Sequence, residues 1–426
     1  MAGHDEITID RPDVVTSDMA VEQSRAGFNI LDQIVKNPQG QISPEDVESN
    51  LGTKDSRVLI TESMEIFESV LSLNENCTAT IVQIEGYAVE NGGTIAVTAA
   101  HCVDEYAGDE LTLYGSFVND DGAVERFTRQ SSQVWVHPFH GDFNRAFDPG
   151  TVNSSADVAF IYFDEQTPPL VTPAEFVPID VDGVVIDLAQ AIETEAELGN
   201  LTVEELINKY EQGFIRDYED LVVPSEGFSG DQVGLTADPR AMILGMNGSQ
   251  TITTDADYAQ GASGGPNYLG VTADDGVVEI QRNAEGQPRI FAVNSAGQGA
   301  SSENPNPDEA YVTALKPEFL NTVPFLNPVY DDGAVCETQT GIINNPNGAN
   351  IRYGDGEIFQ TLIPDRNGPS ALPWGVEVDI HSVTENYLGE QWALVTGPNG
   401  RTGYVNSDLI NANEQRCSIP LNAPSP

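Results

Sequence analysis

Short apolar runs separated by turn residues fill the middle of the chain, between residues 58 and 330. Examples are the stretches 94–99, 111–114, 133–136 and 158–163, each followed within a few residues by Gly or Asp. Runs of this length, bounded by turn formers, predict strands rather than helices. We therefore expect a mostly β domain over residues 58–330.

Two segments show helical spacing instead. Within the β domain, residues 186–221 include Thr202 and Glu205 at the spacing of a capping box, which favours a helical insertion. Near the start of the chain, apolar residues recur at helical spacing over roughly residues 17–36. Residues 1–57 are otherwise polar, and we interpret them as a propeptide, a docking arm or a leader.

A third region begins after the proline-containing stretch 324–328. Residues 331–426 again combine short apolar runs with turns rich in Gly and Asn. This pattern predicts a small β module that is separate from the domain before it.

Charge limits the classes of function. The chain holds 67 acidic and 18 basic residues, which gives a formal net charge of −49. Binding to nucleic acids or to anionic membranes needs a basic surface, so neither is expected. No apolar run reaches the roughly 18 residues of a membrane-spanning helix, so we expect no membrane insertion. Because the acidic groups repel one another, folding stability should rise with salt.

The start of the chain and its cysteines bear on location. Residues 1–10 are acidic and lack the apolar core of a signal peptide, so the protein either stays inside the cell or has lost such a peptide. Four cysteines without metal-binding spacing favour disulfides, and hence secretion or a periplasmic location. Spacing alone leaves open how these four pair: Cys77, Cys102, Cys336 and Cys417.

Three short motifs in the middle region carry chemistry. His101 ends an apolar run, Asp157 precedes another, and Ser263 lies within Gly-Ala-Ser-Gly-Gly-Pro. A serine hydroxyl is a weak nucleophile and needs a histidine base, which in turn needs a buried carboxylate to orient it. The glycines allow a tight turn whose N–H groups, at Gly261 and Ser263, converge on an oxyanion.

Taken singly, each motif has a structural explanation as a core histidine, a turn aspartate or a glycine-rich turn. Together, in the order His, Asp, Ser, they predict a catalytic triad of His101, Asp157 and Ser263.

These motifs resemble those of the chymotrypsin-like serine proteases over roughly residues 58–320. The stretch 135–139 is similar to the His-Pro-aromatic strand of that family, and 293–297 is similar to its substrate-pairing strand. Two further stretches, 227–231 and 255–257, look more like the bacterial branch that includes the glutamyl endopeptidases. The resemblance implies two six-stranded antiparallel β-barrels with the triad in the cleft between them.

The resemblance also implies a disulfide between Cys77 and Cys102, which would brace the histidine loop. One departure concerns activation. Ala262 replaces the aspartate that the animal enzymes place before the serine, so their ion-pair switch does not operate in that form, and the bacterial branch also lacks it. The bond after Arg57 is a candidate processing site, which would make the chain a zymogen.

Substrate specificity rests on four candidates, and the preference for the residue before the cleaved bond stays open. Asp257 lies where trypsin-like enzymes place the carboxylate that binds a basic side chain, although a solvated turn residue is the alternative. Asn294 stands where glutamyl specificity calls for a histidine, so cleavage after Glu is not expected. The substrate-binding candidates are Asp257, Gln260, Ser295 and Gly297.

His137, His140 and Asp142 offer metal-ligating groups close together in the sequence. The His-Pro match accounts for His137 without a metal. We therefore expect neither a metal nor a cofactor.

The last region resembles a bacterial SH3-like module through the stretches 349–356, 392–395 and 400–409. The resemblance implies a small β-barrel, whose ends a disulfide between Cys336 and Cys417 would hold together. It also implies a cell-wall or peptide ligand that binds to exposed aromatic side chains. The aromatic candidates are Tyr353, Trp374, Trp392 and Tyr404, with a core position as the alternative for the last two.

Two hypotheses from different classes follow. The first is an exported serine endopeptidase that acts on polypeptides, with an SH3-like targeting or binding module. The second is a non-catalytic binding protein on a protease scaffold. Because all three triad residues and the glycines are present, the sequence favours the enzyme, which in one version is silent until residues 1–57 are removed.

Overall fold

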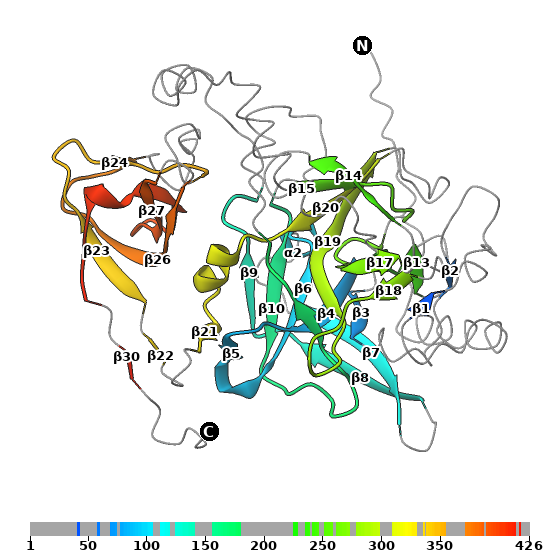
Figure 1. The fold of residues 1–426 in the computed structure, drawn as a ribbon. Helices are drawn as coiled ribbons and strands as arrows, with labels where there is room; N and C mark the ends of the chain where they lie inside the picture. Colours follow the sequence, from blue (N-terminus) through cyan, green and yellow to red (C-terminus); the bar gives the residue numbers. More distant parts are fainter. Residues whose placement is uncertain are drawn as a thin grey trace, which may run out of the picture.

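A computed structural model gives the arrangement of the chain (Figure 1). The protein is mostly β, with a few short helical turns among the residues that the structure describes, so the prediction of a mostly β chain is confirmed. The described residues are 41–42, 58–59, 69–74, 77–104, 111–119, 124–140, 156–179, 225–228, 235–238, 241–246, 251–258, 261–272, 278–298, 309–329, 335–336, 338–354, 371–386, 389–414 and 417–418.

The first antiparallel sheet carries the four strands expected from the apolar runs. Its order is β8-β7-β3-β4-β6-β10-β9. Every residue of β10 is buried, which explains why its run is continuously apolar. The strands are β3 (Val70–Leu73), β4 (Cys77–Gln83), β6 (Thr94–Thr98), β7 (Thr112–Val118), β8 (Val124–Gln130), β9 (Gln133–Val136) and β10 (Ala159–Phe163).

The second antiparallel sheet has the order β2-β13-β12-β16-β19-β20-β15-β14. A short strand, β11 (Ala174–Phe176), pairs in parallel with both β4 and β19 and so joins the two sheets. The strands of the second sheet are β2 (Val58–Leu59), β12 (Ser225–Gly227), β13 (Thr236–Asp238), β14 (Ile243–Met246), β15 (Thr251–Thr254), β16 (Pro266–Tyr268), β19 (Arg289–Gln298) and β20 (Glu309–Ala314).

These pairings differ in detail from two closed six-stranded barrels. Among the described residues the sheets have seven and eight strands, and no pairing joins the two ends of either sheet. Barrel closure stays a prediction.

Residues 41–42 add a short strand to the domain that follows them. β1 (Gln41–Ile42) pairs with β18 (Val278–Ile280), which forms a hairpin with β17 (Gly270–Thr272). The expected helices at 17–36 and 186–221 lie outside the described residues.

The C-terminal region forms its own antiparallel sheet, in the order β28-β27-β26-β23-β29. Its backbone ends also pair, because Cys336 of β22 (Val335–Cys336) lies opposite Cys417 of β30 (Cys417–Ser418). Directly opposed residues in an antiparallel pair have the Cα spacing that a disulfide requires. The sheet strands are β23 (Gln339–Ile343), β26 (Glu377–Glu385), β27 (Gln391–Thr396), β28 (Thr402–Asn406) and β29 (Ile410–Ala412).

This C-terminal module packs against the β domain through aromatic side chains. The 3-10 helix η4 (Pro317–Thr322), drawn in yellow after β20, lies beside the module in Figure 1. The rings of Phe319 and Tyr404 meet edge to face, and so do those of Phe139 and Tyr353. The module and the β domain therefore share one apolar core.

That packing corrects the expected set of ligand-binding aromatics. Tyr353, Trp392 and Tyr404 are buried, because the module uses them for its own core and for contact with the β domain. Of the four candidates, Trp374 alone is exposed, at 67%. Among the described residues, no helix is long and apolar enough to cross a membrane.

Candidate active site

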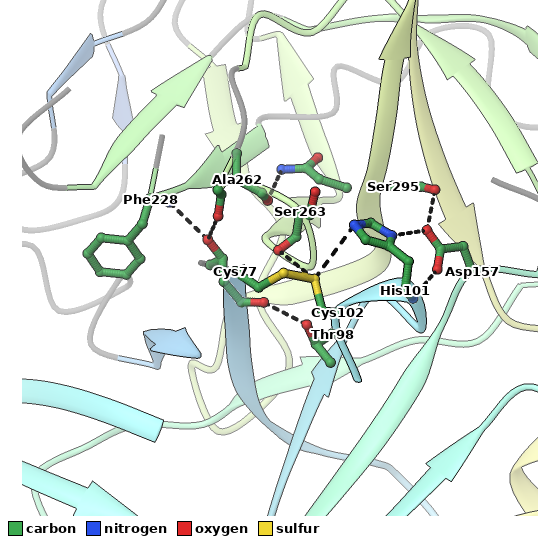
Figure 2. The surroundings of a disulfide bond; sticks show 12 residues. Cys77, Thr98, His101, Cys102, Asp157, Phe228, Ala262, Ser263 and Ser295 are labelled. Atoms are coloured by element: carbon green, nitrogen blue, oxygen red, sulfur yellow. Dashed lines mark hydrogen bonds and ion pairs between the residues drawn. A yellow bond between two sulfur atoms is a disulfide. The ribbon is translucent and has the colours of Figure 1, made fainter. Parts of the chain in front are cut away.

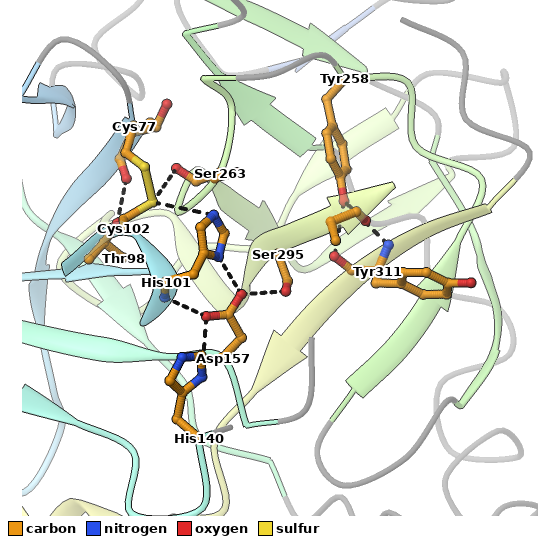
Figure 3. Close-up of polar contacts among 12 residues, drawn as sticks. Cys77, Thr98, His101, Cys102, His140, Asp157, Tyr258, Ser263, Ser295 and Tyr311 are labelled. Atoms are coloured by element: carbon orange, nitrogen blue, oxygen red, sulfur yellow. Dashed lines mark hydrogen bonds and ion pairs between the residues drawn. A yellow bond between two sulfur atoms is a disulfide. The ribbon is translucent and has the colours of Figure 1, made fainter. Parts of the chain in front are cut away.

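Strand register brings the three chemical motifs together. His101 begins the helical turn α2 (His101–Asp104) directly after β6, and Asp157 lies just before β10. Since Thr98 of β6 pairs with Ala159 of β10, both side chains extend from the same end of this strand pair. In Figures 2 and 3, His101 lies between Asp157 and Ser263.

Asp157 is the most constrained of the three residues. Its carboxylate has no exposed surface, and it accepts hydrogen bonds from His101 Nδ1 at 2.7 Å and from the His101 backbone N–H at 2.8 Å. The hydroxyl of Ser295 donates to the same carboxylate oxygen as Nδ1, at 2.5 Å. The other oxygen, Oδ1, lies 3.6 Å from His140 Nδ1.

These donors determine the charge of the carboxylate. Burial by itself raises the pKa of Asp157, but the hydrogen bond and charge of His101, the charge of His140 and the hydrogen bond from Ser295 bring it below its ordinary value. An ionised Asp157 fixes the proton of His101 on Nδ1. The lone pair of Nε2 is then available to act as a base.

The backbone before Asp157 adopts an uncommon conformation. Ala156 has a φ of 52°, in the left-handed region that residues with a side chain rarely occupy. Its carbonyl accepts the N–H of Val158 at 3.0 Å, so the chain bends sharply around Asp157. This bend aims the carboxylate at His101 instead of continuing β10.

The imidazole of His101 remains accessible, with 36% of its side chain exposed. Nε2 lies 3.8 Å from Cys102 Sγ, on the side of the ring that faces Ser263 in Figure 2. In enzymes without substrate, the hydrogen bond between the catalytic base and its serine is often long and tightens when substrate binds.

The turn that carries Ser263 requires its glycines. Gly261 and Gly264 have φ values of 100° and 82°, both in the region that glycine tolerates best. A Cβ on Gly264 would lie 2.1 Å from the Thr98 hydroxyl, and one on Gly265 would lie 1.8 Å from the Glu226 carbonyl. Larger residues would therefore push the turn away from β4, β6 and β12.

Hydrogen bonds fix the carbonyls of this turn and leave its N–H groups available. Thr78 donates its hydroxyl to the Gly261 carbonyl at 2.9 Å and its backbone N–H to the Ser263 carbonyl at 2.8 Å. Within the described parts of the chain, the N–H groups of Gly261 and Ser263 have no acceptor. Two unpaired donors beside a serine suit the stabilisation of a developing oxyanion.

A disulfide braces the histidine, as the resemblance implied. Cys77 of β4 and Cys102 of α2 are bonded, with their Cα atoms 6.1 Å apart (Figure 2). Its sulfur atoms contact the site directly, because Cys102 Sγ also lies 3.7 Å from the Ser263 carbonyl oxygen. The disulfide therefore connects the histidine turn to the strand that holds the nucleophile turn.

The substrate-binding candidates have different surroundings. Ser295 is buried and its hydroxyl is used by Asp157, so its side chain positions the carboxylate. Gly297 pairs with Ala310 of β20, while the pairing with β16 ends at Val293. One edge of β19 beyond Val293 thus has no partner strand among the described residues. Gln260 lies outside those residues.

The two aspartates before the nucleophile turn both touch the backbone. The exposed Asp255 accepts the N–H of Met242 at 2.5 Å, which is the role of a turn residue. Asp257 is half-buried, and its own N–H donates to Asp238 Oδ2 at 2.9 Å.

Tyr258 is a neighbour of the site that the motifs did not reveal. Its ring is buried and its hydroxyl donates to the carbonyl of Ala296 and reaches the Tyr311 carbonyl at 3.0 Å (Figure 3). Burial raises the pKa of this phenol well above its ordinary value, so it stays protonated. Tyr258 thereby ties the loop before Ser263 to β19 and β20.

Asn294 lies beneath the nucleophile turn. It is fully buried, and its side-chain amide donates to the Glu226 carbonyl at 2.8 Å and to the Ala262 carbonyl at 3.3 Å. Its backbone carbonyl accepts the N–H of Gly264 at 2.7 Å. The residue considered for glutamyl specificity therefore supports the turn from below.

The one group of possible metal ligands among the described residues consists of Cys77, His101 and Cys102. Both cysteines are in the disulfide and offer no thiolate, so this group does not fit a metal. His137 Nδ1 accepts the N–H of Phe139 at 3.0 Å, and His140 faces Asp157. Asp142 lies outside the described residues.

Comparison of the sequence with models of protein families and with curated proteins finds no match.

Proposed function

We propose that this protein is a serine endopeptidase of the chymotrypsin-like type, from the branch that resembles bacterial glutamyl endopeptidases. The observation that carries the proposal is the buried, ionised Asp157 bonded to Nδ1 of His101, beside a serine in a glycine turn with available N–H groups. This is the set of contacts that an acyl-transfer mechanism needs. The proposed fold is a pair of six-stranded barrels, with an SH3-like module after them.

The mechanism assigns a role to each residue. His101 Nε2 takes the proton of the Ser263 hydroxyl as Oγ attacks the carbonyl carbon of a peptide bond. The N–H groups of Gly261 and Ser263 donate to the oxyanion of the tetrahedral intermediate. When the C–N bond breaks, His101 gives its proton to the leaving amine, and Ser263 holds the acyl group as an ester.

Water completes the cycle. His101 takes a proton from a water molecule, whose oxygen attacks the ester carbonyl carbon. As the bond to Ser263 Oγ breaks, His101 returns the proton to Oγ, which frees Ser263 and the new carboxyl end of the substrate. Asp157 stays ionised throughout and stabilises the imidazolium in both steps. We further propose that the polypeptide substrate lies as an extended strand along the unpaired edge of β19, near Ser295 and Gly297.

The proposal includes export, since the disulfide between Cys77 and Cys102 persists in an oxidising environment. The C-terminal module would bind a cell-wall or peptide ligand. Trp374, the exposed aromatic candidate, is the residue to test for that role.

Labelling with a fluorophosphonate, followed by peptide mapping, tests the enzyme directly. We expect a covalent adduct on Ser263 in the wild-type chain, or in the chain trimmed after Arg57 if residues 1–57 inhibit it. His101→Ala should abolish the adduct, because the hydroxyl then has no base. A folded, trimmed wild type that gives no adduct would contradict the proposal and favour a non-catalytic binding protein.

A further inference from the structure

The C-terminal module reaches the catalytic carboxylate through a short series of contacts. Tyr353 of the module meets the ring of Phe139 edge to face, with centroids 5.2 Å apart. Phe139 directly precedes His140, whose Nδ1 lies 3.6 Å from Asp157 Oδ1 (Figure 3). We propose that the module is a structural part of the catalytic centre, and that Tyr353 and His140 are positioning residues for Asp157. This proposal rests on the proposed peptidase function.

Hydrogen bonds hold the turn from His137 to His140 and tie it to the backbone beside Asp157. The backbone N–H of Phe139 donates to His137 Nδ1 at 3.0 Å, and that of His140 donates to the His137 carbonyl at 2.9 Å. The N–H of His137 donates in turn to the carbonyl of Val158, the residue after Asp157, at 3.0 Å. A displacement of Phe139 must therefore move His140 or the backbone beside the carboxylate.

The module holds Tyr353 firmly from its own side. The preceding residue, Arg352, exchanges two backbone hydrogen bonds with Tyr404 of β28, both of 2.9 Å. The Tyr404 hydroxyl donates to Glu318 of η4 at 2.5 Å, and the Lys316 ammonium lies 3.2 Å from the same carboxylate oxygen. These directional contacts in a buried interface fix how the module is oriented on the β domain.

A second aromatic contact supports the same turn. Phe319 of η4 packs on the ring of His137 with centroids 4.3 Å apart, and it also contacts Phe139 and Tyr404. Across the interface, His381 of β26 lies 3.0 Å from the Asn321 carbonyl oxygen. The turn from His137 to His140 is thus packed between η4 and the module.

Each oxygen of Asp157 then has two neighbours. Oδ2 accepts from His101 Nδ1 and Ser295, while Oδ1 accepts from the His101 backbone and faces His140. Because misplacement of a catalytic group by about 1 Å can cost roughly 100-fold in rate, loss of one neighbour should slow the chemical step. Binding of the substrate should be little affected.

The rate of fluorophosphonate labelling at Ser263 tests whether these neighbours position Asp157. Measuring this rate at several probe concentrations separates the maximal labelling rate from the dissociation constant of the probe. We expect His140→Leu to lower the maximal rate about 10-fold and to leave the dissociation constant unchanged. His140→Asn, which keeps an N–H donor at the position of Nδ1, should recover most of the rate. A purely structural role would move neither quantity once the samples are matched for folded fraction.

The module's part is tested by a double-mutant cycle. Tyr353→Ala should lower the maximal labelling rate about 5-fold. In the double mutant with His140→Leu, the rate should fall by clearly less than the product of the two single effects, because both residues act on Asp157 through the same series of contacts. If Tyr353→Ala unfolds the module, Tyr353→Leu replaces it. Val383→Ala, at an exposed position of β26, is the matched control and should label at the wild-type rate.

The outcomes separate the two proposals. Failure of the wild type to label would remove the peptidase function. Wild-type labelling together with unchanged maximal rates in folded His140→Leu, or in the folded Tyr353 variant, would overturn this inference alone. Strict multiplication of the two single effects would also overturn it, because the residues would then act independently.

Discussion

The two sheets each contain a buried carboxyl group near the site, and the pKa values of the two groups are shifted in opposite directions. Asp157, before β10, has a lowered pKa, whereas burial raises the pKa of Glu226, on β12, well above its ordinary value. Both side chains are almost completely buried, at 0% and 2% exposed. Burial therefore does not decide their charge.

The number of donors makes the difference. Asp157 accepts three hydrogen bonds and faces a second imidazole. Glu226 accepts one, from the Tyr268 hydroxyl at 3.0 Å, and its other oxygen has no partner among the described residues. Several donors to a buried carboxyl group favour its charged form, whereas burial with a single donor favours the protonated form. Of these two buried carboxyls, the one with more donors is the one that the proposed chemistry uses.

The largest expected effect is the loss of the anion itself. Asp157→Asn keeps the shape but removes the charge and allows the wrong tautomer of His101, so the rate of Ser263 labelling should fall by about 10⁴. Glu226→Gln is the matched control and should label at close to the wild-type rate, because the raised pKa of Glu226 favours the protonated acid and an amide is uncharged as well. Comparable losses in both variants would mean that the two carboxyls do not differ as described.

Removing one donor from Asp157 should have the next largest effect. Ser295→Ala deletes a hydrogen bond to a charged group, a contribution of about 1.5–3 kcal/mol, so we expect labelling to slow by about 10- to 100-fold. Ser295→Thr, which retains the hydroxyl, serves as the control. The rate constants of labelling for the three proteins give the answer, and an unchanged rate in Ser295→Ala would show that this donor is dispensable.

The pH dependence of stability should distinguish the two groups in a third way. The pKa of Glu226 is raised in the folded state. Its contribution to the free energy of unfolding is therefore complete at a pH below its ordinary pKa of 4.5, and it is lost as the pH rises toward the pKa of the folded state. The pH dependence for Asp157 has the opposite sign. Its contribution to the free energy of unfolding is present at a pH above its ordinary pKa of 3.8 and is lost as the pH falls.

The free energy of unfolding in urea, measured between pH 5 and 8, tests this sign for Glu226. As the pH rises, the free energy of unfolding of the wild type should fall relative to that of Glu226→Gln. The expected fall corresponds to at most about a tenfold decrease in the folding equilibrium constant for each pH unit. A difference between the two proteins that stays constant across this range would show that Glu226 titrates normally.

We expect salt to have the smallest effect. Salt changes stability by screening the repulsion among surface charges, and it leaves the two buried carboxyl groups unaffected. With a net charge of −49, the melting temperature should rise by several degrees between roughly 0.1 and 1 M sodium chloride, as the screening length shrinks to about 3 Å. Glu226→Gln should show the same rise, because a buried neutral group is not screened. A melting temperature that is unchanged or lower in salt would contradict this expectation.

Local sequence patterns predicted much of the β framework and the site. The strands at 94–99, 133–136 and 158–163 were recognisable because each is a short apolar run that ends in turn residues. The glycine pattern around Ser263 likewise predicts a tight turn, and the positive φ values of Gly261 and Gly264 confirm it. The helical patterns at 17–36 and 186–221 stay predictions.

Other features had no signal along the chain. Ser295 was recognised as part of a strand, yet nothing near it in sequence indicates that its hydroxyl would meet Asp157, 138 residues away. From the sequence, His140 is only a metal-binding candidate, and Tyr353 is predicted to be an exposed aromatic residue. Each of these side chains owes its role to a partner from a distant segment.

The sequence by itself therefore determined which residues carry the chemistry, where strands and turns form, and which cysteines were available to pair. Tertiary structure alone decided that the pKa of Asp157 is lowered and that of Glu226 is raised, and that the module's Tyr353 packs against the turn beside the carboxylate. The physical reason is that periodicity and turn chemistry act between near neighbours in the chain. The charge of a buried group depends on the donors that strand register and packing bring to it from far away.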